Sequence, residues 1–417
     1  MNDAPKDNIV RHSVLLLVTS NGANVMNVLF QALMGWSLPK TEFREMLSMM
    51  SLMLLIITPL DAVRTSVAHM SAVGMQAGRP WVARELAAQW SARFFAIAAV
   101  AVAAGFALSP WIAAYENVSS VWPVRIVSLV CGVMLFAPFL VGIFQGTQFF
   151  LWMSAATGIW TIIRLIAGYV IVRIFLPTAT GALTAHLIGL AGGLAASAWG
   201  LRSLPRNSDG AAPQRHTLFG GYFSQSFLTL AAYGLLTYAD LLLVSHFFPA
   251  ADADRFAQAA LIGRSVIFLP VPIAYAMFPK VVSVGASSRR TLATLLKALA
   301  MVAAIIGAAV FVCTFLTWIP IRLLFGIKAP TAEQLHLART VLWAMSPLTL
   351  TYMLVNFEMA QHRFRALPFL WLFVAAYIGA VALIHDTLAH FILILATVST
   401  ASAICLTTLV IRAHTRD

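Results

Sequence analysis

The chain has little charge for its length. Of its 417 residues only 10% are Asp, Glu, Lys or Arg, whereas 60% are hydrophobic, and the mean hydropathy is +0.86. A water-soluble protein of this size needs far more charge to cover its surface. Apolar runs of about 20 residues recur along the chain, which is the length that an α-helix needs to cross a bilayer. Composition therefore predicts an all-α polytopic membrane protein.

Cysteine is scarce as well. Cys131, Cys313 and Cys405 are the only three, and all lie inside apolar segments. Their spacing fits no metal site, so we expect them to be small packing residues and expect no metal or cofactor. A Gly-x-x-x-x-Gly-Lys-Ser/Thr phosphate loop is also missing, which excludes ATP hydrolysis by that route.

The Lys and Arg residues that give the chain its net charge of +12 gather near the ends of the apolar runs. No basic recognition helix or aromatic stacking platform accompanies it, so nucleic acid is excluded as a partner. With the N-terminus placed in the cytoplasm, 15 Lys and Arg residues fall in inside segments and 7 in outside segments. This distribution predicts a bacterial inner-membrane protein with both termini in the cytoplasm. The other basic residues lie within or at the edges of the predicted spans: Arg64, Arg93, Arg125, Arg164 and Arg264.

We expect 12 membrane-spanning helices. The predicted spans are residues 13–35, 46–68, 88–109, 122–145, 150–173, 181–201, 220–246, 256–279, 292–318, 338–357, 366–384 and 389–411. The weakest division separates the fourth span from the fifth, where residues 145–148 form the only polar break. The first 12 residues are polar and no cleavage site follows them, so we expect the first span to act as an uncleaved insertion signal.

The two halves of the chain resemble each other. Pro39 and Pro59 lie 20 residues apart, Pro249 and Pro270 lie 21 apart, and a stretch with acidic and basic residues follows the first proline each time. Related helix bundles in one membrane protein are typical of transporters, in which two lobes move around a shared site.

A polar segment separates these halves. Residues 202–219 are rich in Pro, Gly, Ser and Asn, as flexible linkers are. We therefore predict an N-terminal six-helix lobe at residues 1–205, a cytoplasmic linker at 206–219 and a C-terminal six-helix lobe at 220–417. With six spans between the copies, the lobes are parallel repeats.

A polar stripe marks the first helix of each predicted lobe. The first stripe contains Asn21, Asn24 and Gln31, with Asn27 nearby, and the second contains Gln225, Thr229, Tyr233, Thr237 and Asp240. Residues at these helical steps share one face. The stripes predict substrate-binding groups that face each other across a hydrated cavity. Hydrogen bonding between helices inside each bundle is the alternative that stays open.

Ionisable residues within spans predict functional groups or ion pairs, because isolated charges are unstable in a bilayer. Asp61 and Arg64 are three residues apart and can pair on one helical face. Asp240 and Arg264 form a second candidate pair on spans seven and eight, and for both acids ion coupling and ion pairing stay open. Arg164 has no acidic neighbour in its own span.

The arginines Arg64, Arg164 and Arg264 outnumber the deep acids Asp61 and Asp240. A cavity of that sign favours an anionic substrate group such as phosphate, which a guanidinium can hold through two hydrogen bonds. It disfavours organic cations.

Several short apolar motifs occur in a fixed order along the chain. They are residues 144–149 with 164–168, then 238–247 with 256–264 and 277–280, then 324–326, and finally 356–363. In this order they resemble the polysaccharide and oligosaccharide flippases of the multidrug/oligosaccharidyl-lipid/polysaccharide (MOP) exporter superfamily. Where these flippases have Gly-x-Tyr before the eighth span, this chain has Asp254-Arg255-Phe256, and it is short for the family.

The resemblance implies a MOP/MATE-like exporter that works by alternating access, with spans one, two, seven and eight as portals. It would flip a lipid-linked oligosaccharide from the cytoplasmic to the outer leaflet for surface polysaccharide biosynthesis. Arg164, Asp240 and Arg264 occupy positions where the family favours these residue types. The implied partners are the lipid-linked glycan, membrane lipids, a coupling H⁺ or Na⁺, and other polysaccharide-assembly proteins.

Two alternatives remain. A cation-coupled multidrug exporter on the same fold would need deep acids, and only Asp61 and Asp240 are available. A membrane glycan polymerase or ligase would need catalytic carboxylates in a sizeable outer loop, and only Asp252 and Asp254 resemble such a pair. These two aspartates fit the N-terminus of a helix equally well, so we expect a transporter and not an enzyme.

Overall fold

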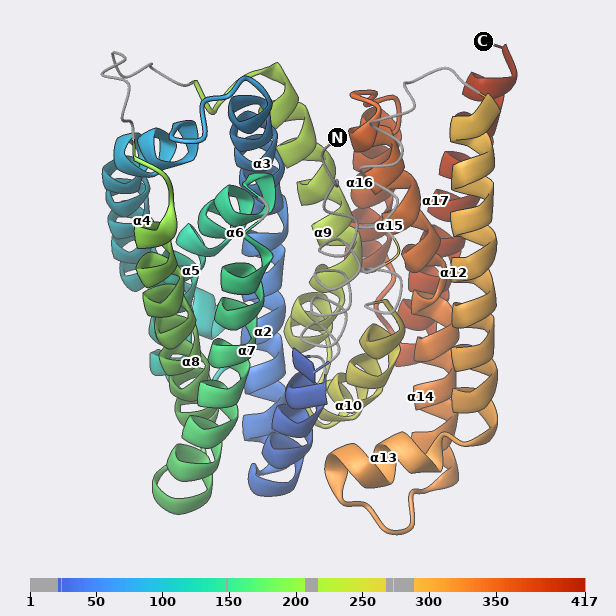
Figure 1. The fold of residues 1–417 in the computed structure, drawn as a ribbon. Helices are drawn as coiled ribbons and strands as arrows, with labels where there is room; N and C mark the ends of the chain where they lie inside the picture. Colours follow the sequence, from blue (N-terminus) through green and yellow to red (C-terminus); the bar gives the residue numbers. More distant parts are fainter. Residues whose placement is uncertain are drawn as a thin grey trace. The chain divides into compact units, whose positions relative to one another are not determined.

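The computed structural model describes residues 22–23, 25–147, 149–206, 217–267, 273 and 289–416. These ranges contain helices and connecting turns but no strand, and residues 25–37 are helical. The helices that follow are shown in Figure 1: α2 (Lys40–Ile57), α3 (Asp61–Gln76), α4 (Val82–Tyr115), α5 (Trp122–Met134), α6 (Phe136–Gly146), α7 (Phe150–Gly168), α8 (Ala179–Gly200), α9 (Gly221–Phe247), α10 (Ala250–Ile267), α12 (Arg289–Phe315), α13 (Trp318–Phe325), α14 (Ala332–Met345), α15 (Pro347–Ala360), α16 (Leu367–Leu383) and α17 (Leu388–Arg416).

Within the described ranges, nine helical segments are long and apolar enough to cross a membrane. They correspond to nine of the twelve predicted spans, and the shorter apolar helix α16 corresponds to a tenth. The predicted spans at 13–35 and 256–279 lie partly outside the described residues. The all-helical, polytopic membrane architecture predicted from composition is thus confirmed.

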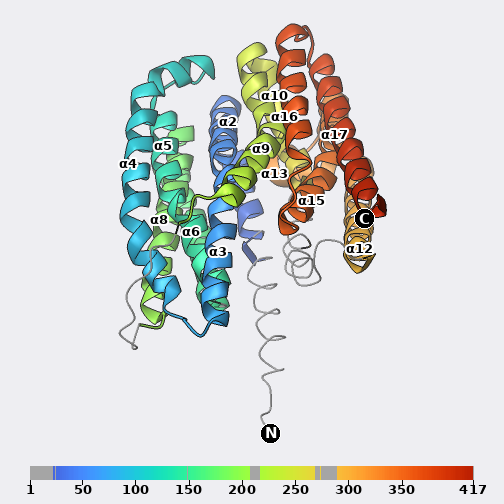
Figure 2. The same cartoon turned by 90° about the horizontal axis from the view of Figure 1, so that it is seen from above.

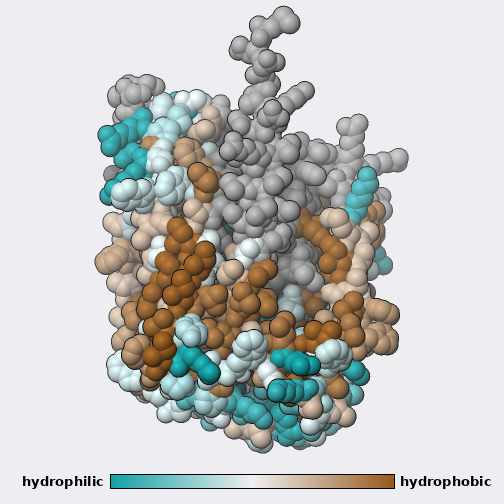
Figure 3. All heavy atoms as spheres, turned by 60° about the horizontal axis from the view of Figure 1, so that its bottom comes forward, coloured by the Kyte–Doolittle hydropathy of each residue, from teal (hydrophilic) through white to brown (hydrophobic). Residues whose placement is uncertain are grey.

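The outer faces of these helices are strongly apolar. In α4 only 11% of the most apolar window is buried, and side chains such as Phe95 and Val100 are 68% and 71% exposed. Figure 3 shows such apolar side chains grouped into broad patches, with hydrophilic residues gathered elsewhere on the same face. A water-soluble monomer does not leave so much large apolar surface exposed, so this surface is suited to contact with lipid.

The chain forms two compact units. The first comprises Met1–Met49 and Leu60–Phe223, and the second comprises Met50–Pro59 and Ser224–Asp417. In the first unit α7 packs along α8, α3 along α6 and α4 along α5, and Figure 2 shows the last two pairs from above. In the second unit α10 packs along α14, and α17 packs along α14, α15 and α16.

A short 3₁₀ turn that contains a proline lies between α2 and α3. The turn Thr58–Leu60 separates the two helices, and Pro59 in it cannot donate a backbone hydrogen bond. Helix α2 starts directly after Pro39, and α10 starts directly after Pro249. A proline thus directly precedes each of these two helices, whereas the second predicted break, at Pro270, lies outside the described residues.

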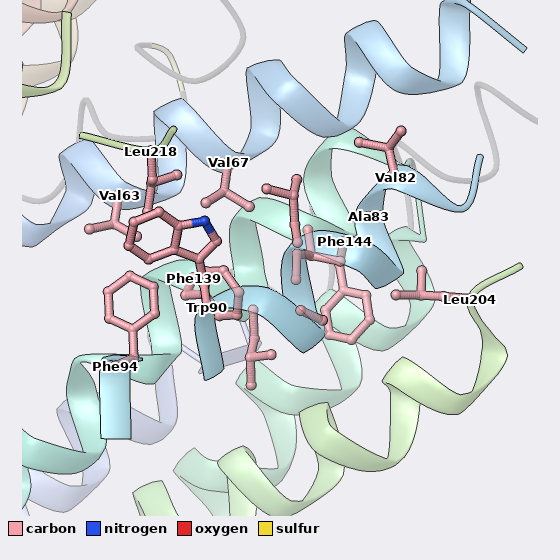
Figure 4. Packing of buried hydrophobic residues seen from close by; sticks show 14 residues of the cluster. Val63, Val67, Val82, Ala83, Trp90, Phe94, Phe139, Phe144, Leu204 and Leu218 are labelled. Carbon is pink, nitrogen blue, oxygen red and sulfur yellow. The ribbon is translucent and has the colours of Figure 1, made fainter. Parts of the chain in front are cut away.

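An aromatic and aliphatic core holds the first unit together. Figure 4 shows Trp90, Phe94 and Phe139 in this core, with Leu204 and Leu218 packed into it. These two leucines lie on either side of residues 207–216, which are outside the described ranges. Burying each leucine contributes about 1.5–3 kcal/mol, so the chain on both sides of the polar segment is anchored in the first unit.

Two glycines allow α6 to lie directly against α3. A Cβ atom added to Gly142 would lie 2.6 Å from the backbone oxygen of Arg64, and Gly146, one turn further, makes a similarly close approach to α3. Small residues four apart let membrane helices touch through their backbones. This contact fixes α3, which carries Asp61 and Arg64, relative to α6.

We expect Gly142→Ala to destabilise the protein, because the added methyl group must push α3 away from α6. The loss should be about 1–3 kcal/mol, measured as a lower apparent melting temperature in detergent. Gly379→Ala is the matched control, because no atom lies within 4 Å of the added Cβ there. Equal melting temperatures for the two variants would show that the close approach has no energetic role.

Candidate functional site

Three arginines are buried among the apolar helices. Arg64, Arg164 and Arg264 are 9%, 3% and 7% exposed, respectively. A buried guanidinium is strongly destabilising unless other groups supply charge and hydrogen bonds. The partners of each arginine therefore show whether its charge is free to act on a ligand.

Arg64 is paired with a carboxylate on its own helix. Its Nε and Nη2 atoms donate to the two oxygens of Asp61 at 2.5 and 2.6 Å, and its Nη1 donates to Oε1 of Gln145 at 2.7 Å. Asp61 opens α3, where the helix dipole also favours an acid. The predicted pairing is present, and Gln145, which the sequence showed only as part of a polar break, completes it.

Arg264 is paired within the second unit. Its Nη2 donates to Asp240, which is fully buried on α9, and its Nη1 donates to Oγ of Ser51 at 2.7 Å. The bond therefore joins α9 to α10. Oδ2 of Asp240 and the hydroxyl of the neighbouring Tyr377 have no hydrogen-bond partner within the described part of the chain. The ion pair is neutral overall but leaves these two polar atoms unused.

Arg164 has neutral partners. Its Nη2 donates to Oδ1 of Asn27 at 2.9 Å, and its Nη1 lies 3.1 Å from Nδ1 of His186. The guanidinium carbon lies 4.0 Å from the ring centre of Phe30 and 4.9 Å from that of Trp160. No carboxylate forms an ion pair with Arg164 in the ranges that the structure describes.

The histidine contact is informative about protonation. A guanidinium can only donate hydrogen bonds, so Nδ1 of His186 accepts and the ring is neutral, with its proton on Nε2. His186 Nε2 and Arg164 Nε are both buried without a hydrogen-bond partner among the described residues. The cluster thus carries one uncompensated positive charge and two unused N–H donors.

Close contact between α7 and α8 positions this cluster. A Cβ atom on Gly189 would lie 2.7 Å from Cβ of Arg164 and 2.7 Å from the backbone oxygen of Trp160. Only glycine allows the two backbones to approach in this way. His186, three residues before Gly189 on α8, is thereby held opposite Arg164.

The sequence suggested that three arginines act together on an anion. In the structure Arg64 and Arg264 each have their own carboxylate, and Arg164 alone of the three does not. Sequence analysis missed His186 and Ser51 as partners because each is an isolated polar residue in an apolar run, and Gln145 was visible only as part of the polar break at residues 145–148. That the three arginines line one cavity stays a prediction.

Two threonines of the polar stripe on α9 bond to their own helix, whereas the buried hydroxyl of Tyr233 has no hydrogen-bond partner among the described residues. Thr229 and Thr237 donate to the backbone oxygens of Gln225 and Tyr233 at 2.7 and 2.8 Å, and both threonines are buried. The ring of Tyr233 lies 5.4 Å from that of Tyr352. The stripe was interpreted either as one wall of a hydrated cavity or as a set of hydrogen bonds between helices. These threonine bonds support neither interpretation, because each of them stays within α9.

The first stripe is only partly described. Asn21 and Asn24 lie outside the described residues, and Gln31 is half-buried. Asn27, on the same segment, supplies the bond to Arg164. The two stripes as groups facing each other across a hydrated cavity stay a prediction.

The Asp252 and Asp254 pair begins α10. Asp252 lies 3.1 Å from Arg255, and Arg255 also pairs with Glu333. An acid in the first turn, paired with an arginine one turn later, stabilises a helix N-terminus. These contacts account for Asp252 as a residue that stabilises the start of α10, without a catalytic role.

Comparison with known proteins gives a fold. No family model and no curated protein matches the chain. An inward-facing multidrug resistance MATE family transporter of the MOP superfamily matches with a TM-score of 0.73 and 12% identity, over 94% of this chain and 95% of that one. An outward-facing MATE structure matches with a TM-score of 0.69 and 13% identity, over 100% and 97%.

A third solved structure is a MOP superfamily transporter from Pyrococcus furiosus, described as having a binding pocket of reverse polarity that suggests a different function. It matches with a TM-score of 0.61 and 12% identity, over 99% of this chain and 96% of that one. The chain therefore has the MATE/MOP transporter fold.

We expect Asp240→Leu to lower the free energy of unfolding by about 3–5 kcal/mol, because it leaves Arg264 buried without a counter-charge. The double variant Asp240→Leu/Arg264→Met should recover most of this loss, since no lone charge remains. Denaturant unfolding in detergent measures both. Asp61→Leu should cost less, because the Asp61 side chain is 33% exposed. A double variant no more stable than the single one would contradict the pairing argument.

Proposed function

We propose that the protein is a membrane transporter that moves an amphipathic anion, a lipid-linked oligosaccharide, from the cytoplasmic to the outer leaflet of the bacterial inner membrane. The fold supports a transporter. The uncompensated charge of Arg164 supports an anionic substrate, and it is the observation on which the proposal depends.

The first step concerns charge. Asn27 and His186 hold the guanidinium of Arg164 through neutral atoms at 2.9 and 3.1 Å, so they fix its position without cancelling its charge. A buried cation without a counter-ion is destabilised by several kcal/mol. A phosphate group that reaches Arg164 would relieve this, and a guanidinium suits phosphate geometry through paired donors.

The second step concerns the lipid. On α7 the side chains of Ile162 and Ile166 are 49% and 60% exposed, whereas Arg164 between them is buried. The helix therefore presents an apolar face outward and a cationic group inward. A lipid-linked phosphate has the same two parts, so its chain could stay in the bilayer while its headgroup approaches Arg164.

Transport by this fold is proposed to proceed by alternating access. MATE transporters of similar fold have been solved in inward-facing and outward-facing conformations. The charge on Arg164 would then select the anionic headgroup in one state, and a proton or sodium gradient would supply the driving force.

A cation-coupled multidrug exporter is the second candidate. The fold supports it equally, and one observation favours it: Oδ2 of Asp240 and the hydroxyl of Tyr377 have no hydrogen-bond partner within the described residues. Two such oxygens could bind a cation. Against it, Asp61 and Asp240 already neutralise arginines.

The test begins with a deletion strain, from which lipid-linked sugars are extracted and assigned to a leaflet. We expect them to accumulate facing the cytoplasm, with loss of the surface polysaccharide. Arg164→Gln should fail to restore export at normal membrane levels, with a rate at least about tenfold lower, because it removes a charge-assisted contact worth about 1.5–3 kcal/mol.

Arg93→Gln is the matched control, because Arg93 is exposed and stacks on Trp90, and it should restore export. Full export by Arg164→Gln would refute the role of the charge. An intact surface glycan together with raised drug susceptibility in the deletion strain would favour the multidrug exporter.

A further inference from the structure

A second group of buried charges lies in the first unit, apart from the arginine clusters. It joins the beginning of α2 to the turn that follows α4. Arg44, Glu45 and Ser48 of α2 are all buried, and so is Glu116, which directly follows α4. Neither the proposed transport function nor the polar stripes use any of these residues.

Hydrogen bonds hold the turn at residues 116–119 against α2. Ser48 Oγ donates to Oε2 of Glu116 at 2.7 Å, and the backbone nitrogen and hydroxyl of Ser119 donate to Glu45 at 3.0 and 3.1 Å. Arg44 donates to the backbone oxygen of Asn117 at 3.3 Å. The turn is tight, because Asn117 adopts a φ of 50°.

Few neighbouring groups stabilise a negative charge on Glu116. Its carboxylate accepts one bond, from Ser48, and no Lys or Arg lies within ion-pair distance of it in the described part of the chain. Burial raises the pKa of Glu116 to about 7, and the hydrogen bond from Ser48 and the charge of Arg44 oppose this rise only in part. The carboxyl group therefore changes charge near neutral pH.

In the part of the chain that the structure describes, the other charged or titratable groups around the turn come from two helices. Helix α2 contributes Glu42, Arg44 and Glu45, and α4 contributes Tyr115. Glu42 is already engaged, because it accepts a bond from the backbone nitrogen of Ala179 at the start of α8, at 2.7 Å. Glu45 and Arg44 both bond to the turn itself, whereas the carboxylate of Glu116 accepts a single bond, from Ser48 of α2.

We propose that Glu116 is a proton-operated latch: its neutral carboxyl group keeps the turn at 116–119 packed on α2, and its ionisation releases the turn towards water. The neutral group can still accept the bond from Ser48. The ionised group, with that single bond, is more stable when hydrated than when buried.

The direction of the pH effect follows from the raised pKa. The folded state binds this proton more tightly than a solvated glutamate, whose ordinary pKa is 4.5. The stabilisation of the packed turn is thus complete below about pH 4.5 and is lost as the pH rises through about 7. In the predicted topology this turn lies on the outer face, so the latch would respond to external pH, whatever the substrate.

Hydrogen exchange in the full-length protein in detergent tests the latch between pH 5.5 and 8.5, after correction for intrinsic exchange rates. The amide of Val118, bonded to the backbone oxygen of Ala113 at 2.9 Å, and that of Ser119 report on the turn. We expect their protection to fall by about tenfold for each pH unit as the pH rises towards 7, and to level off above about pH 7, where the packed turn is ionised as well. In Glu116→Gln, which cannot ionise, protection should stay high throughout.

Two further variants separate the latch from a general loss of structure. Glu333→Gln, at an exposed glutamate in the second unit, should keep the wild-type profile. Ser48→Ala should move the transition to higher pH, because it removes a bond to the ionised form. A flat wild-type profile, an unshifted transition in Ser48→Ala, or a pH-dependent profile in Glu116→Gln would overturn the proposal.

Discussion

The structure depends on one constraint: a charge inside an apolar helix bundle needs a partner. In water an arginine is solvated wherever it lies, but in a bilayer the surrounding helices must supply opposite charge or hydrogen bonds. Arg64 and Arg264 meet this requirement with Asp61 and Asp240. Among the described residues Arg164 meets it with the neutral atoms of Asn27 and His186 and with the rings of Phe30 and Trp160, and this difference gives it a functional interpretation.

Glycines allow the helices that carry these polar groups to pack closely, which fixes the positions of the groups. Gly142 brings α6 against the backbone of α3 near Arg64, and Gly189 brings α8 against the backbone of α7 at Arg164. In both places the helix that carries the arginine is held at backbone distance from the helix that carries its partner, Gln145 or His186. The same small residues that pack the membrane helices therefore also fix the polar groups between them.

The two proposals use different kinds of buried charge. Arg164 keeps its charge, and a mobile anion would supply what the protein does not. Glu116 can lose its charge, because a carboxylate becomes neutral by binding a proton near neutral pH, whereas a guanidinium becomes neutral only by releasing a proton, at a much higher pH. A transporter can use the first to select a substrate and the second to adjust a turn on its surface.

The sequence by itself determined the helical membrane architecture, because apolar runs of span length have few alternatives to helices in a bilayer. It also determined the Asp61–Arg64 pair, since three residues on one helix set that geometry locally. Tertiary structure decided that Arg264 bonds to Ser51, far away in the chain, that Arg164 meets His186 instead of an acid, and that Glu116 is buried against α2. Those contacts depend on which helices pack together and at what depth, and the spacing of residues along one helix does not contain that information.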